Sequence, residues 1–332
     1  MGRATLSHMR IVTAQLGALL IIGLALNTSV DAQARKKKAA APAQLPCGDL
    51  VGFQVRLDRQ GFSSGQIDGT PGANFSRTLS AFQTAHKLPV GKPDCATWEA
   101  LGAGSSEPAI ASYTVTDEDM KGPFEKVPPK LAEQAKLTTL GYQSPIELLA
   151  ERFHTSPALL SQLNRGVAIA AGREIKVPGV AAFNPETKPA ADAAAGDVSI
   201  QVSKEESALR ATRADGTLVF YAPVSSGSVH DPLPPGDFKV LGVGWRPVFH
   251  YNPDLFWDAK PADEKAKIPA GPNNPVGVMW LGLSKPHYGI HGTPQPQLVG
   301  RQETNGCVHL TNWDVVKLAA LVSPGVSVKV TG

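Results

Sequence analysis

A change of sequence pattern near Asp197 constrains the fold more than any other feature of this chain. Before it, apolar residues recur at helical spacing; after it, short apolar runs stand between turns rich in Gly and Pro. These runs lie at residues 198–202, 218–221, 238–241, 276–283 and 326–330. Short strands between such turns predict a mostly-β sandwich or barrel for the C-terminal part of the chain.

One helix interrupts the predicted strands. Thr311 and Asp314 have the spacing of a capping box, and the helix continues over residues 315–322 to a Ser-Pro-Gly stop. The 332 residues allow two or three domains. The predicted fold class is therefore multidomain α+β, with smaller helical units ahead of the mostly-β domain.

The first 34 residues have the pattern of a secretory signal peptide. Arg3 and Arg10 precede an apolar run at residues 16–26, and an Ala-Gln-Ala cleavage site follows at residues 32–34. An uncleaved membrane anchor is the alternative, but eleven apolar residues are far fewer than the roughly 20 that span a bilayer. We expect an exported protein that works in the periplasm.

Two segments are typical of linkers. Residues 35–46 are basic and then rich in Ala and Pro, and residues 181–196 are rich in Ala and Pro without apolar periodicity. The net charge of only +3 predicts no large basic face, so nucleic acid is not an expected partner.

The chain has three cysteines, an odd number in a chain expected to be exported. Cys47 and Cys95 flank one compact segment, and we predict a disulfide between them. Cys307 is then left over, which marks it as a candidate reactive thiol. A buried, inert thiol is the alternative interpretation of Cys307.

A histidine stands sixteen residues before this thiol, at His291. A Cys thiol needs a base because its free pKa is above neutral pH, and a nearby His can form a thiolate–imidazolium pair. The carbonyl of Gly292 is available to orient the imidazole. Backbone N–H groups of Gly306 and Cys307 are candidates for stabilising an oxyanion.

The motifs around these residues resemble the catalytic domain of the L,D-transpeptidases of the YkuD type, over residues 197–331. They are Val224-Ser225-Ser226-Gly227, Pro234-x-Gly236, Pro275-Val276-Gly277, Tyr288-Gly289-Ile290-His291-Gly292-Thr293 and Gly306-Cys307-Val308-x-Leu310-x-Asn312-x-Asp314. The resemblance implies that Cys307 attacks the L-centre carbonyl of a peptidoglycan tetrapeptide stem, with His291 as base. D-Ala leaves, and an amine resolves the thioester.

The same resemblance implies the partners. The acceptor amine belongs to diaminopimelate or to an envelope protein, and carbapenem-type inhibitors are expected to acylate Cys307. Neither a cofactor nor a metal is expected. The sequence departs from the family at Asn305, where His is frequent, and at His309, where Arg or Asn is frequent. Five residues are predicted to contact substrate: Trp280, Tyr288, Thr304, Asn305 and His309. Core packing is an equal alternative for Trp280 and Tyr288.

Residues 47–103 resemble the helical peptidoglycan-binding domain. The matching motifs are Phe53-Gln54-x-x-Leu57, Gly61-Phe62, Ile67-Asp68-Gly69, Ala81-Phe82-Gln83 and Thr97-Trp98-x-x-Leu101. Three short helices are marginally stable alone, and a disulfide would add roughly 2–4 kcal/mol. A helical spacer without a ligand is the alternative.

Residues 112–180 resemble a LysM domain, a glycan-binding module with the order strand, helix, helix, strand. The expected elements are a strand at 113–115, helices that begin after Ser144 and Ser156, and a strand at 175–178. Residues 121–142 depart from that family because they are longer and richer in Lys and Pro.

Other functions fit parts of the pattern. The chain could be an inactive wall-binding scaffold, or a carboxypeptidase that resolves the thioester with water. A zinc peptidase would use residues such as His230, Asp231, His287, His291 and His309, although their spacings match no short zinc motif. Residues 245–274 are expected to form either a lid or an ordinary surface loop.

Overall fold

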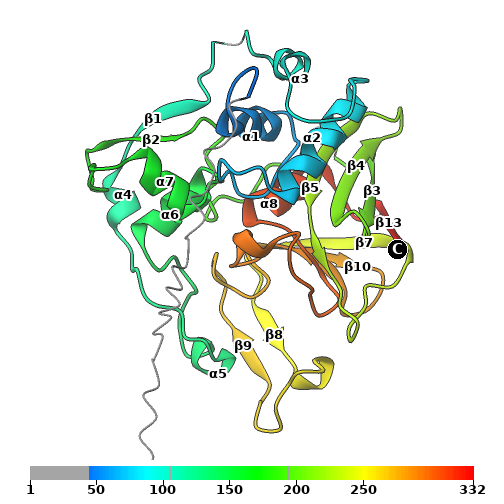
Figure 1. Cartoon of the computed structure of the whole chain (residues 1–332). Helices are drawn as coiled ribbons and strands as arrows, with labels where there is room; N and C mark the ends of the chain where they lie inside the picture. The colour runs from blue at the N-terminus through cyan, green and yellow to red at the C-terminus, as the bar shows by residue number, and fades with distance from the viewer. Residues whose placement is uncertain (1–44, 105, 193–194) are drawn as a thin grey trace, which may run out of the picture. The chain divides into compact units, whose positions relative to one another are not determined.

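The computed structural model of the chain describes residues 45–104, 106–192 and 195–332 (Figure 1). The predicted signal peptide and nearly all of the first predicted linker lie outside these residues. Within the described ranges, no helix is long and apolar enough to cross a membrane.

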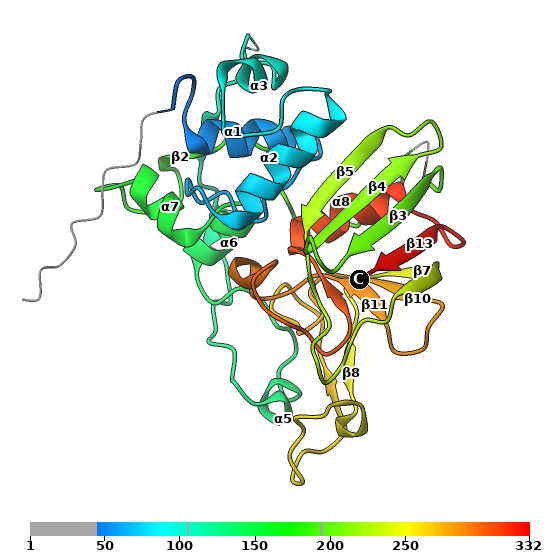
Figure 2. The same cartoon turned by 45° about the vertical axis from the view of Figure 1, so that its right-hand side comes forward.

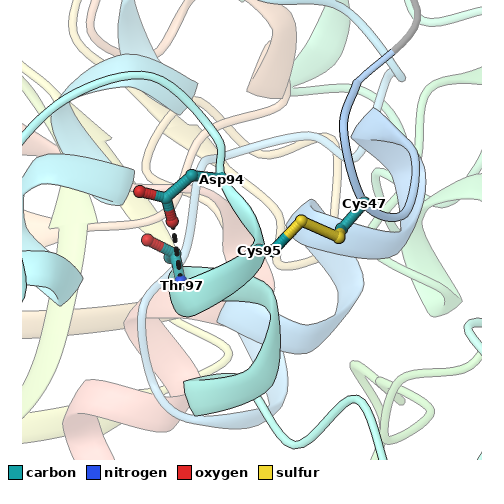
Figure 3. Close-up of a disulfide and its surroundings, with 4 residues drawn as sticks. All are labelled: Cys47, Asp94, Cys95 and Thr97. Carbon is teal, nitrogen blue, oxygen red and sulfur yellow. Dashed lines mark hydrogen bonds between the residues drawn. A yellow bond between two sulfur atoms is a disulfide. The ribbon is translucent and has the colours of Figure 1, made fainter.

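The first unit is a group of three helices, α1 (Leu50–Arg59), α2 (Ala73–Ala85) and α3 (Cys95–Ala100). Cys47 and Cys95 form a disulfide with a Cα–Cα distance of 5.2 Å (Figure 3). Asp94 caps α3 by accepting a hydrogen bond from Thr97 N at 2.7 Å. Helix α2 begins at Ala73, and its apolar face includes buried Phe75.

The second unit has the expected order of strand, helix, helix and strand. β1 (Ile110–Thr114) pairs antiparallel with β2 (Glu174–Pro178), and α6 (Pro145–Arg152) and α7 (Pro157–Leu163) lie between them in sequence. The hydroxyls of Ser144 and Ser156 cap these two helices, and each helix has Pro in its first turn. The long segment before α6 holds two short helices, α4 (Asp117–Met120) and α5 (Leu131–Gln134).

The C-terminal unit is built on a nine-stranded sheet in the order β5-β4-β3-β13-β7-β10-β11-β12-β6. Its strands are β3 (Val198–Ser203), β4 (Ala208–Arg213), β5 (Leu218–Pro223), β6 (Ser225–Ser226), β7 (Gly236–Trp245), β10 (Met279–Leu283), β11 (Gly289–His291), β12 (Val308–His309) and β13 (Ser327–Thr331). Figure 2 shows the last strand, β13, between β3 and β7. This mostly-β domain with one helix, α8 (Asn312–Leu321), confirms the predicted fold class.

Three local expectations need correction. β10 starts at Met279 instead of residue 276, because Gly277 turns the chain with a φ of +63°. Residues 245–274 are more than a loop: β8 (Phe249–Tyr251) and β9 (Ala266–Ile268) pair as a hairpin around a short 3-10 helix, η1 (Pro253–Leu255).

The third correction concerns the start of α8. Thr311 Oγ1 accepts from Asp314 N at 3.2 Å, as in a capping box. The Thr311 hydroxyl also donates to Asp314 Oδ2 at 2.7 Å. The Asp314 carboxylate therefore accepts from the Thr311 hydroxyl. This bond replaces the one that a capping box would have from the Thr311 backbone N–H to the carboxylate.

Candidate active site

Two short parallel strands bring the predicted base and nucleophile together. β11 pairs with β12 so that Ile290 lies opposite Val308 and His291 opposite His309. Cys307 immediately precedes β12. Because side chains alternate along a strand, Cys307 and His309 share the sheet face of His291.

A tight turn at Gly306 leads into Cys307. Gly306 has a φ of +90°, in the left-handed region that favours glycine. A Cβ at this position would lie 3.0 Å from Cε1 of Tyr288, so the absence of a side chain allows the Tyr288 ring to pack on the turn. The Tyr288 hydroxyl donates to the carbonyl of Pro232 at 3.2 Å, which fixes the ring beside the thiol.

Thr304 holds the loop before Cys307 in place. Its buried hydroxyl donates to the carbonyl oxygen of Cys307 at 2.6 Å and accepts from Gly227 N at 2.7 Å. Its own N–H donates to the Gly227 carbonyl at 3.2 Å. The hydroxyl therefore anchors the loop from inside, whereas Asn305, the next residue, is exposed.

His291 is 2% exposed and tightly oriented. Its Nδ1 lies 2.7 Å from the carbonyl oxygen of Gly292, and because a carbonyl can only accept, Nδ1 carries the proton and Nε2 is left as the basic atom. Trp280 stacks on the imidazole with 5.1 Å between ring centroids and 14° between planes. Burial lowers the pKa of His291 to about 4, against the opposing effect of the Gly292 carbonyl.

The environment of Cys307 likewise favours the neutral form of its side chain. Removal of water from around the sulfur raises the pKa of Cys307 to about 11, although a backbone hydrogen bond with Gly289 opposes the shift. Sγ lies 3.6 Å from the carbonyl oxygen of His287, the acceptor for its proton. Both shifts favour a neutral thiol and a neutral imidazole over the thiolate–imidazolium pair.

His309 lies against His291, with 4.4 Å between the two ring centroids. Burial lowers its pKa well below the ordinary value, and His291 adds to that effect. Its buried Nδ1 has no hydrogen-bond partner within the part of the chain that the structure describes. A neutral His309 can offer a hydrogen bond to a substrate but brings no positive charge for a carboxylate.

Sequence reasoning assigned no role to Asn312, whose amide lies against the backbone of Gly292, the residue after His291. Its Oδ1 accepts from Val278 N at 3.1 Å, and a Cβ on either Gly277 or Gly292 would lie 2.1 Å from this oxygen. Two glycines thus allow the amide to approach the backbone that carries the orienting carbonyl. The sequence signal that could have found Asn312 was its position in the first turn of the helix that follows Cys307.

The residues of the alternative zinc site are not gathered. The His230 ring stacks on Trp257 with 4.1 Å between centroids, whereas His291 and His309 pack on each other. Within the described ranges, no group of three or more His, Cys, Asp or Glu side chains is placed to hold a metal.

Two family models match this chain. Residues 197–330 match the "L,D-transpeptidase catalytic domain", and residues 49–101 match the "Putative peptidoglycan binding domain". Both matches fall within the units to which the sequence motifs pointed. The resemblance of residues 112–180 to a LysM domain stays a prediction.

The chain is also similar to named proteins. It is 31% identical over 189 residues to the "Putative L,D-transpeptidase YkuD" of Bacillus licheniformis, covering 56% of this chain and 93% of that protein. It is 29% identical over 184 residues to the protein of the same name from Bacillus subtilis, covering 55% and 90%. A solved L,D-transpeptidase from Mycobacterium smegmatis has a TM-score of 0.35 and 15% identity, covering 49% of this chain and 65% of that one.

Proposed function

Because the chain belongs to the L,D-transpeptidase family, we propose that it is a peptidoglycan transpeptidase with Cys307 as nucleophile and His291 as general base. One observation carries the assignment. The parallel pairing of β11 with β12 places the Gly-Cys turn and the oriented imidazole on one sheet face. The family membership supports the tetrapeptide stem of peptidoglycan as the substrate in this proposal.

The first half-reaction transfers an acyl group to the enzyme. The Cys307 thiol turns from the His287 carbonyl toward Nε2 of His291, which takes its proton as sulfur attacks the L-centre carbonyl. The N–H groups of Gly306 and Cys307 are candidates for stabilising the oxyanion. Collapse of the intermediate breaks the bond to D-Ala, whose amine leaves with the proton from His291, and a thioester remains on Cys307.

The second half-reaction needs a neutral nucleophile. An amine attacks the thioester carbonyl and gives its proton to Nε2 of His291, and Cys307 leaves as the thiol after taking that proton back. A diaminopimelate side chain gives a cross-link between stems, and an amine of an envelope protein gives a tethered protein. Water in the same position gives a carboxypeptidase reaction.

The pKa shifts support a general-base role over a preformed thiolate. With the pKa of Cys307 at about 11 and that of His291 at about 4, proton transfer is unfavourable until the sulfur begins to bond to carbon. The nearby carbonyls of His287 and Gly292 offer no charge that would stabilise an isolated thiolate. Proton transfer from Cys307 to His291 and the development of negative charge on the carbonyl oxygen then take place together in the transition state.

The other units suggest where the reaction takes place. We infer that the three-helix unit binds peptidoglycan, as its family match suggests, and that the enzyme is exported to the periplasm by residues 1–34 and is associated with the wall. Trp280, Tyr288, Asn305 and His309 are proposed to contact the stem peptide, because the first two flank the base and thiol and the others adjoin the nucleophile turn.

The activity is tested by incubating the protein from residue 35 onward with purified disaccharide-tetrapeptide and identifying the products by mass. Cross-linked dimer with release of D-Ala is expected, tripeptide alone would indicate a carboxypeptidase, and unchanged substrate would contradict the proposal. Cys307→Ala is expected to retain the fold and lose all product. A carbapenem should add to the wild type and not to this variant.

A further inference from the structure

We propose that Glu151, on helix α6 of the second unit, is a positioning residue that holds the base His291 in place through Asn312. The inference rests on the proposed function, since it assumes that His291 works as the base. It adds a contribution from outside the catalytic domain, because Glu151 precedes the matched residues 197–330 by more than forty positions.

The first link joins the two units through a buried hydrogen bond. Asn312 Nδ2 donates to Glu151 Oε1 at 2.9 Å. The two side chains belong to residues that are 0% and 7% exposed, so water does not compete for these groups. Asn312 Nδ2 also donates to the carbonyl of Pro272 at 3.0 Å, and the two acceptors together fix the plane of the amide.

The second link runs from the amide to the base. With Nδ2 held on one side, Oδ1 points at the Gly277–Gly292 contact and accepts from Val278 N at 3.1 Å. Gly292 is so close that a Cβ would lie 2.1 Å from Oδ1. The carbonyl of Gly292 in turn receives the Nδ1 proton of His291 at 2.7 Å. Each step from Glu151 to the imidazole is therefore a direct contact.

The chemical form of Glu151 suits this role. Burial raises its pKa to about 8, and the charge of Glu147 adds to the shift, whereas the hydrogen bonds from Asn312 and Tyr142 oppose it. The side chain is thus a neutral carboxylic acid at neutral pH. A neutral acceptor can hold the Asn312 amide without placing a negative charge near His291, where it would stabilise the imidazolium.

Loss of this acceptor has a specific expected effect. The amide would keep only the Pro272 carbonyl as partner for Nδ2, and its Oδ1 could shift away from Gly292. The imidazole would then lose its fixed orientation and part of its shielding from water. Because small misplacements of a catalytic group lower rates strongly, we expect catalysis to fall more than stability does.

The test uses the full chain and three variants. Glu151→Met keeps the length of the side chain and removes the acceptor, so it leaves no large cavity. Glu151→Gln restores a neutral acceptor of the same shape. Tyr142→Phe is the matched control, because it removes the 3.3 Å hydrogen bond from the Tyr142 hydroxyl to Glu151 Oε1 and leaves Asn312 untouched.

Two readouts separate positioning from simple destabilisation. The first is kcat/KM per folded molecule as a function of pH. The second is an NMR titration of the His291 ring nitrogens, which needs no turnover. Two other titratable residues, Cys307 and His309, share the sheet face of His291. Every variant retains both of them. Trp280, which stacks on the base from β10, is uncharged.

For Glu151→Met we expect kcat/KM to fall about tenfold or more, with the acid limb of the profile and the NMR pKa of His291 both moving upward. Glu151→Gln and Tyr142→Phe should stay within about twofold of the wild type, with an unmoved limb. A Glu151→Met enzyme with the wild-type limb and rate per folded molecule would overturn the inference. If the wild type made no product, the proposed function would fail, and the NMR titration would still decide whether Glu151 positions His291.

Discussion

Two buried histidines in this protein share a setting and differ in their partners. His154 stacks on Trp313 with 5.3 Å between ring centroids, and His291 stacks on Trp280 at 5.1 Å. Burial is the largest effect on both, and it lowers the pKa of each imidazole. In each ring, Nδ1 donates to an oxygen.

The two imidazoles differ in the oxygen that accepts the Nδ1 proton, and this difference bears on what each histidine can do. His154 Nδ1 lies 3.1 Å from the carboxylate of Asp58, and Lys317 Nζ lies 2.8 Å from the same carboxylate. These three side chains come from the three-helix unit, the second unit and α8, so they join the units through an ion pair and a hydrogen bond. His291 bonds an uncharged carbonyl and has a basic nitrogen on the face of the nucleophile. A similar degree of burial thus accompanies a contact between units at His154 and the proposed general base at His291.

The strongest test of this comparison replaces each histidine by glutamine. His291→Gln should lower kcat/KM by about 10²–10⁴-fold, because Gln cannot take the proton from Cys307. His154→Gln retains a donor to Asp58 and should leave the rate per folded molecule within about twofold. Steady-state kinetics normalised to the folded fraction would measure both. Similar activity losses in the two variants would contradict the division of roles.

A second prediction concerns the pH dependence of stability at Glu151. Its folded pKa of about 8 lies above the ordinary 4.5, so the contribution of Glu151 to stability is fully present below about pH 4.5 and is lost as the pH rises toward 8. Glu151→Gln does not ionise and should gain stability over the wild type by about 3 kcal/mol near pH 7, with little of that gain at pH 4. Urea unfolding at both pH values would show it, and a pH-independent difference would count against the buried neutral acid.

The smallest expected effect is at the cluster of Asp58, His154 and Lys317 that joins the units. Lys317→Met leaves the Asp58 carboxylate, 3% exposed, without its ammonium partner. Since the Lys317 side chain is 29% exposed, we expect a loss of about 1–3 kcal/mol in unfolding free energy and an unchanged rate per folded molecule. Lys329→Met, at an exposed site on β13, is the control and should change stability by less than about 0.5 kcal/mol. Equal effects of the two variants on stability would contradict a stabilising role for the ion pair between Lys317 and Asp58.

The contribution of the Asp58–His154–Lys317 cluster to stability should also depend on pH in the acid range. Lys317 and His154 hold the pKa of Asp58 below its ordinary value, against the effect of burial. A depressed carboxyl pKa stabilises the fold above the unfolded pKa of about 4, and the contribution is lost as pH falls below it. The difference in stability between wild type and Lys317→Met should therefore shrink between pH 5 and about pH 2, which acid unfolding followed by circular dichroism would measure.

The sequence was sufficient for features that depend on local pattern. The Ser-Pro starts of α6 and α7, the strands with alternating apolar residues and the helix after Thr311 all appear where they were expected. The motif also singled out Cys307 and His291 because the chemistry needs a thiol and a base in fixed backbone settings.

What escaped prediction depends on contacts that are distant in sequence. β12 and β6 have two residues each, too few to show any periodicity, and only their pairing in the sheet defines them. The charge state of the Cys307–His291 pair depends on burial, which residue types alone do not reveal. The hydrogen bond from Asn312 to Glu151 joins residues 161 positions apart, and no local pattern connects them.

The central claim is that the acyl group passes through a thioester on Cys307. The most direct measurement traps the wild type with tetrapeptide substrate under acid quench and locates the added mass by peptide mapping. We predict an acyl-enzyme lacking D-Ala, with the mass on the peptide that contains Cys307 and none in Cys307→Ala. Product formation by Cys307→Ala, or an adduct on any other residue, would contradict the account.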